Sequence, residues 1–121
     1  MTIRRNKFGA KRTELDGIMF DSKAEASRYA TLKIIQKAGE ISDLKCQPGY
    51  TLSAYDEFGN VFDIGVYKAD FEYTDANGSL VVEDVKGGKA TLTPLSRWKI
   101  KHFQAQYGLT VSLIDGKGRA I

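Results

Sequence analysis

Two neighbouring β-strand patterns constrain the fold of this chain more than any other feature of its sequence. Residues Val61 to Tyr73 are rich in β-branched and aromatic side chains, and Leu80 to Lys86 form a second run of this kind. The segment between them, Thr-Asp-Ala-Asn-Gly at residues 74–78, is typical of a turn. The sequence therefore predicts two adjacent strands that run antiparallel.

Charged side chains inside these two strands require an explanation, because strands usually bury apolar residues. Asp70 lies in the first strand, and Asp84 and Lys86 lie in the second. The two-residue period of a strand places Asp84 and Lys86 on one face of the sheet and Glu83 on the other. Glu83 is therefore expected in the opposite layer, and it would replace Asp84 only if the strand register slipped by one residue.

The length of the turn decides which side chains face each other. A three-residue loop, with its glycine in the left-handed conformation, pairs Asp70 with Asp84. The same loop pairs Lys68 with Lys86. A two-residue turn instead pairs Asp70 with Val85 and points Asp70 away from Asp84. Only the first geometry brings the two carboxylates together.

Facing carboxylates repel each other unless a cation lies between them. Hard cations such as Mg²⁺ prefer oxygen ligands, so the three-residue loop predicts a Mg²⁺ site. A network of cross-strand ion pairs among the same aspartates and lysines is the alternative. Spacing alone favours that network, because Asp and Lys are common at strand edges.

Helix signals frame these strands. Ser22 and Glu25 have the spacing of a capping box, which predicts a helix that ends at Gly39, and a second helix is expected from Leu95 to Tyr107. Further strands are expected at residues 13–20 (as a short hairpin), 41–46, 49–55 and 109–114. This order predicts an α/β fold in which helices flank a mixed β-sheet. We expect one domain over residues 13–121.

The positive charge is concentrated at the N-terminus. Residues 1–12 contain five of the 18 Lys and Arg residues and no acid, so 13 basic and 15 acidic side chains remain, a net of −2. A basic arm of this kind, which we expect to be flexible, suits a polyanion such as DNA, although a solvated terminus explains it equally well. No apolar run approaches the roughly 20 residues that cross a bilayer. The chain also lacks a secretory signal, so we expect a cytoplasmic protein with no membrane partner.

The ordered set of motifs resembles the PD-(D/E)xK nuclease superfamily. It comprises Tyr-x-Ala-Asp-Phe at residues 67–71, followed by Asp84-x-Lys86, with upstream segments at residues 20–26 and 47–48. Together these motifs are similar to a family of small phage and prophage proteins of unknown function, related in style to Holliday-junction resolvases. One departure is the alanine at position 69, where the superfamily motif has proline.

The resemblance implies a restriction-endonuclease-like core, with the order helix, three strands, helix and strand. It also implies a Mg²⁺-dependent endonuclease that hydrolyses DNA, for which we expect Mn²⁺ to substitute. The implied catalytic residues are Lys86, Asp70, Asp84 and Glu25, and the implied metal ligands are Asp70, Asp84, Glu25 and the main-chain carbonyl of Val85. Glu25 has a second interpretation of nearly equal weight, as the partner of Ser22 in the capping box.

Basic residues along the chain are candidates for DNA contacts. Two of them, Lys99 and Lys101, are implied by the resemblance, since basic residues of the second helix often meet phosphates in the superfamily. The full set of expected DNA-binding residues is Lys7, Lys11, Arg12, Lys89, Lys99 and Lys101. Lys89 belongs to a Gly-Gly-Lys turn that could let the backbone approach a phosphate, although a plain loop explains it as well.

The function expected from these observations is cleavage of DNA, with branched DNA such as a four-way junction among the candidate substrates. A non-catalytic DNA-binding or assembly module on the same fold is the alternative, because fold does not imply function. A sequence-specific restriction enzyme is disfavoured, because 121 residues leave little chain for reading bases. Since a duplex or a junction has two strands to cut, we expect a homodimer.

Overall fold

The computed structural model describes residues 12–87 and 92–121. Its elements, in chain order, are β1 (Thr13–Leu15), β2 (Ile18–Phe20), α1 (Lys23–Lys37), β3 (Ser42–Cys46), β4 (Gly49–Tyr55), β5 (Val61–Lys68), β6 (Phe71–Thr74), β7 (Leu80–Val85), α2 (Pro94–Tyr107) and β8 (Val111–Ile114). Except for Arg12, the predicted N-terminal arm lies outside the described residues, and so does Lys89.

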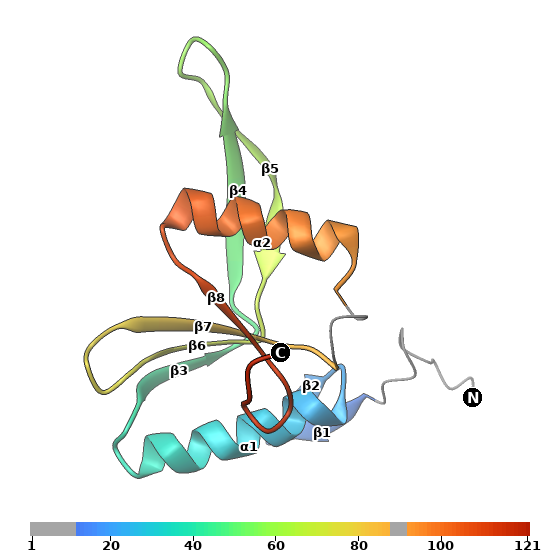
Figure 1. The fold of residues 1–121 in the computed structure, drawn as a ribbon, viewed down its shortest axis with the longest axis vertical. Helices are drawn as coiled ribbons and strands as arrows, with labels where there is room; N and C mark the ends of the chain where they lie inside the picture. The colour runs from blue at the N-terminus through green and yellow to red at the C-terminus, as the bar shows by residue number, and fades with distance from the viewer. Residues whose placement is uncertain (1–11, 88–91) are drawn as a thin grey trace.

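A four-stranded mixed sheet forms the centre of the molecule (Figure 1). Its strand order is β3-β6-β7-β8, in which β6 is antiparallel to β3 and β7, and β8 is parallel to β7. Helix α1 lies on one side of this sheet and helix α2 on the other. This arrangement confirms the predicted α/β class and is compatible with a restriction-endonuclease-like fold.

Each face of the sheet carries its own hydrophobic core. Val85 packs with Phe71 and the α1 residue Leu32, whereas Val82 packs with the α2 residues Ile100 and Phe103. Odd-numbered and even-numbered residues of β7 therefore point to different layers, as the two-residue period predicts.

The β6–β7 turn has the three-residue geometry. Asp75 donates its N–H to the carbonyl of Ser79 at 2.8 Å, and Gly78 adopts a left-handed φ of 80°. Within the ladder Phe71 pairs with Glu83. This register confirms the pairing that brings Asp70 opposite Asp84.

The prediction of one long strand from residue 61 to residue 73 is wrong, because the chain changes partner strands within this segment. Ala69 donates its N–H to the carbonyl of Pro48, but Asp70 donates to Glu83 of β7. Strand β5 consequently pairs with β4 in a separate two-stranded sheet. Lys68 pairs with Gly49 there, so the prediction that Lys68 faces Lys86 is also wrong.

Helix α1 begins after Ser22, as the capping box predicts, and ends at Lys37, two residues before Gly39, which has a φ of 82°. Ser22 Oγ accepts the N–H of Glu25 at 3.1 Å at the start of α1. Thr93 caps α2 in the same way, and Gly108 ends α2 with a φ of 68°. Among the described residues, no helix is long and apolar enough to cross a membrane.

Candidate active site

The structure brings Asp70 and Asp84 together where the chain passes from β5 into β6. Asp70 lies one residue before the β6–β7 ladder begins, and its N–H donates to the carbonyl of Glu83 at 3.1 Å. Its carboxylate accepts the N–H of Val85 at 2.7 Å. The Asp70 side chain is therefore held against the edge of β7, directly beside Asp84.

Asp84 is fixed by two further side chains. Only 5% of Asp84 is exposed, and its carboxylate accepts the hydroxyl of Tyr67 at 2.7 Å. Lys86 Nζ lies 3.4 Å from the other carboxylate oxygen. The main-chain N–H of Lys86 donates to the carbonyl of Ile114, which ties the lysine to β8. The expected residues Asp70, Asp84 and Lys86 thus share one site.

Lys86 compensates only part of the negative charge at this site, through its contact with Asp84. Burial, followed by the charges of Asp84 and Glu25, raises the pKa of Asp70 far above its usual range, and the N–H of Val85 opposes this only in part. A cation that binds between this carboxylate and its neighbours would lower the free energy of its ionised form. The site therefore has the electrostatics of a cation-binding site.

Glu25 lies in the first turn of α1 and contributes to the electrostatics of the site. Its main-chain N–H donates to Ser22 Oγ, which is the half of the capping box that does not use the Glu25 carboxylate. Burial raises the pKa of its carboxyl group, and so do the charges of Asp21 and Asp84. Among residues 12–87 and 92–121, however, no three His, Cys, Asp or Glu side chains are grouped to hold a metal ion. The facing pair, Asp70 and Asp84, is thus the acidic centre of the site, and Glu25 lies in its electrostatic surroundings.

The carbonyl of Val85 lies on the same strand edge as the Asp70 carboxylate. In an extended strand the N–H and C=O of one residue point to the same side. Because the N–H of Val85 donates to Asp70, the C=O of Val85 also points toward Asp70. Two carboxylates and one main-chain oxygen can therefore serve a hard cation together.

Glu83 belongs to the opposite layer, as predicted. Its carboxylate accepts two hydrogen bonds from Arg28 of α1, at 2.8 Å and 2.7 Å, and one from the hydroxyl of Tyr73. Glu83 is therefore paired with Arg28 in the α1 layer, and its carboxylate does not belong to the Asp70–Asp84 site.

Sequence reasoning missed the roles of Tyr67 and Arg28. Buried carboxylates almost always have hydrogen-bond partners, so partners for Asp84 and Glu83 had to exist. Their identity depends on how the separate β4–β5 sheet and helix α1 pack against β7. Residue spacing does not reveal that packing.

Basic side chains line two cavities near the site. Arg12 and Lys68 line a cavity of about 440 Å³ that also includes Gln47, whose N–H donates to the carbonyl of Asp70. Arg97 and Lys101 line a second cavity of about 670 Å³ that includes Leu113 of β8.

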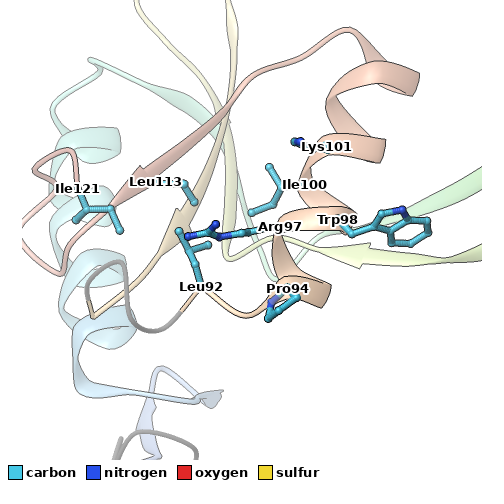
Figure 2. Close-up of a pocket in the computed structure, with 8 residues that line it drawn as sticks. All are labelled: Leu92, Pro94, Arg97, Trp98, Ile100, Lys101, Leu113 and Ile121. Atoms are coloured by element: carbon cyan, nitrogen blue, oxygen red, sulfur yellow. The ribbon is translucent and has the colours of Figure 1, made fainter.

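Figure 2 shows Arg97 extending from α2 toward Leu92 and Leu113. Leu113 is the β8 partner of Asp84, so this second cavity begins one strand away from the acidic pair. Of the expected DNA-binding residues, Arg12 lines the first cavity and Lys101 lines the second. Lys99 is partly buried on α2, and Lys7, Lys11 and Lys89 lie outside the described residues.

Comparison with known proteins identifies a family for the chain. Residues 5–115 match a family described as a protein of unknown function, DUF1064. Because this match covers most of the chain, the protein belongs to the DUF1064 family. No curated protein and no solved structure matches the chain. An activity for this DUF1064 protein must therefore be argued from its site.

Proposed function

We propose that this protein is a metal-dependent endonuclease that hydrolyses phosphodiester bonds of DNA. The observation that carries the proposal is the pair of carboxylates Asp70 and Asp84, which face each other on neighbouring chain segments with Lys86 beside them. Acids in this order, followed by a lysine, are the pattern that the sequence shares with the PD-(D/E)xK superfamily.

Mg²⁺ is the cation that best fits this donor set. Asp70, Asp84 and the carbonyl of Val85 provide oxygen ligands only, which hard cations prefer. Burial, followed by the charges of Asp84 and Glu25, raises the pKa of Asp70, and a divalent cation would offset the repulsion between these carboxylates. Because the protein supplies few ligands, water and phosphate oxygens would complete the coordination, as is common for Mg²⁺.

The protein residues have separate tasks in this proposal. When bound, Mg²⁺ would supply Lewis acidity and lower the pKa of a coordinated water. Lys86 would stabilise the negative charge that develops on the phosphate oxygens. Tyr67 holds Asp84 in place, and the N–H of Val85 holds Asp70, so both carboxylates are oriented before DNA arrives.

DNA is the substrate that the nearby positive charges favour. Arg12 and Lys68 line the cavity that includes Gln47, and Arg97 and Lys101 line the cavity that includes Leu113, the β8 partner of Asp84. Cations in both cavities would be available to contact the phosphate backbone of bound DNA. Branched DNA, such as a four-way junction, is the first substrate class to examine.

A non-catalytic DNA-binding module is the second candidate, and one contact favours it. The 3.4 Å approach of Lys86 to Asp84 neutralises part of the acidic pair without a metal. In such a module the two aspartates and the lysine would serve only to join β7 to its neighbours.

Cleavage assays with two matched variants test the proposal. Asp84→Asn removes the charge but keeps an oxygen that can accept the Tyr67 hydroxyl. Asp43→Asn makes the same change at an exposed residue of β3 and serves as the control. We expect cutting of a labelled four-way junction or its matched duplex by wild type and Asp43→Asn, and none by Asp84→Asn. Equal cutting by all three proteins would refute the assigned site, and DNA binding without cutting by wild type would support the non-catalytic module.

A further inference from the structure

The β4–β5 hairpin leaves an unusually apolar surface uncovered. Figure 1 shows its far half extending beyond helix α2 and away from the central sheet. Near its base, Leu52 and Tyr67 are buried against α2. Along the hairpin six large hydrophobic side chains are exposed: Tyr55 (72%), Phe58 (81%), Val61 (55%), Phe62 (54%), Ile64 (45%) and Val66 (51%).

The two edges of this hairpin differ in how their backbone groups are satisfied. Side chains of α2 cover the outer edge of β4, where the carbonyl of Thr51 accepts hydrogen bonds from Tyr107 and Gln106. Ser53 is covered in the same way, since its N–H donates to Gln106 and its carbonyl meets the His102 ring at 2.8 Å. Helix α2 therefore blocks this edge against further strand pairing.

In the part of the chain that the structure describes, no helix side chain is hydrogen-bonded to the outer edge of β5 in this way. Thr51 turns its backbone groups away from β5, so its antiparallel partner Val66 turns its own N–H and C=O away from β4. Within residues 12–87 and 92–121, no strand other than β4 pairs with β5. An exposed apolar strand with an open edge is a template for another strand.

The size of the apolar surface suits a dimer. A fully exposed aromatic side chain has about 200 Å² of accessible surface and an aliphatic one about 100 Å². Multiplied by the exposed fractions of the six residues, these areas give roughly 550 Å² of exposed apolar surface per copy. Two copies together carry about 1,100 Å² of this apolar surface, which is comparable with the approximately 1,000 Å² expected of a specific interface. A new backbone ladder would add to this area.

The charge of the hairpin argues for a second copy and against DNA. Residues 49–68 contain the acids Asp56, Glu57 and Asp63 and one base, Lys68. The acids would repel phosphates. Antiparallel pairing of two hairpins about a two-fold axis brings the base of one, with Lys68, beside the acidic outer half of the other.

We propose that the outer edge of β5 pairs antiparallel with β5 of a second copy, forming a continuous four-stranded sheet. Such a two-fold contact is self-complementary, as homodimer interfaces are. Asp70 follows β5 by two residues, so each copy would hold one Asp70–Asp84 pair at its own end of the shared sheet. The use of this dimer to cut two DNA strands rests on the proposed nuclease function, whereas the pairing itself rests on the hairpin surface.

Sedimentation analysis of matched variants tests the interface. Ile64→Lys combined with Val66→Lys places charge on the open edge, while Ile34→Lys changes an isoleucine that is 71% exposed on α1. We expect wild type and Ile34→Lys to be dimers and the double variant to be a monomer with an unchanged circular dichroism spectrum. A monomeric wild type, or a double variant that stays dimeric, would overturn the inference.

Hydrogen exchange of wild type gives a readout that does not depend on folding of a variant. The outward N–H of Val66 should exchange slowly in concentrated solution and faster on dilution as the dimer dissociates. Fast exchange of this N–H at every concentration would contradict the paired edge. Absence of DNA cleavage by an intact dimer would instead contradict the proposed function and leave the interface standing.

Discussion

Replacing Arg28 with methionine should destabilise the protein by about 3–5 kcal/mol, because it leaves a buried carboxylate without its partner. The guanidinium donates two hydrogen bonds to Glu83, at 2.8 Å and 2.7 Å. The side chains of Arg28 and Glu83 are only 12% and 3% exposed, so water cannot replace the lost bonds. Methionine keeps much of the volume of arginine, which limits the effect to the charge.

This loss is a large share of the roughly 5–15 kcal/mol that stabilises a typical domain. With an m value of about 1.5 kcal/mol/M, the urea midpoint should fall by about 2 M or more. The control Arg97→Met changes an exposed arginine of α2 and should alter the free energy of unfolding by less than about 0.5 kcal/mol.

A second variant separates the lost ion pair from lost packing. Combining Arg28→Met with Glu83→Leu removes both charges, and we expect it to recover at least half of the lost stability, since apolar replacements of buried ion pairs are often neutral or better. A loss below about 1 kcal/mol for Arg28→Met alone would refute the reasoning. Failure of the double variant to recover would show that packing of the arginine stem dominates.

Three further predictions concern the site, the turn and the first hairpin. Tyr67→Phe removes the hydroxyl that donates to Asp84. This change should lower the rate of DNA cleavage about tenfold, which corresponds to the free energy of one hydrogen bond. An unchanged rate would argue against this role of Tyr67. Gly78→Ala should lower the free energy of unfolding by about 1–2 kcal/mol in thermal denaturation, because alanine is strained at a φ of 80°; a neutral result would contradict the three-residue loop. The hydrogen bond from Lys33 lowers the pKa of Asp16. Wild type should therefore have a higher free energy of unfolding than Asp16→Asn near neutral pH, and this difference should disappear as the pH falls through the lowered pKa. A stability difference that does not change with pH in urea titrations would exclude that ion pair.

The sequence predicted the strand register because local chemistry determines it. The glycine of the Asp-Ala-Asn-Gly turn adopts the left-handed conformation that the three-residue loop requires, and the facing of Asp70 and Asp84 follows from that loop length. The separation of Val82 and Val85 into different layers follows equally directly from the period of a strand.

The change of partner strands at residues 69 and 70 could not be predicted in this way. The alternation of side chains continues through the break, so the pattern looks like one long strand. The opposite segment changes sheets at the same level, where Gln47 adopts a φ of 55° and donates its N–H to Asp70. These tertiary contacts also bring Tyr67 to Asp84, and they cannot be predicted from the spacing of residues along the chain.

Adding Mg²⁺ back to a chelated mixture of wild type and labelled DNA junction tests the central claim most directly. With protein in excess and EDTA present, we predict binding without cutting. Cleavage should begin when Mg²⁺, or Mn²⁺ in its place, exceeds the chelator. Cutting that proceeds unchanged in EDTA, or DNA that stays bound and intact after Mg²⁺ is added, would contradict the assignment of Asp70 and Asp84 as the metal-binding centre of a nuclease.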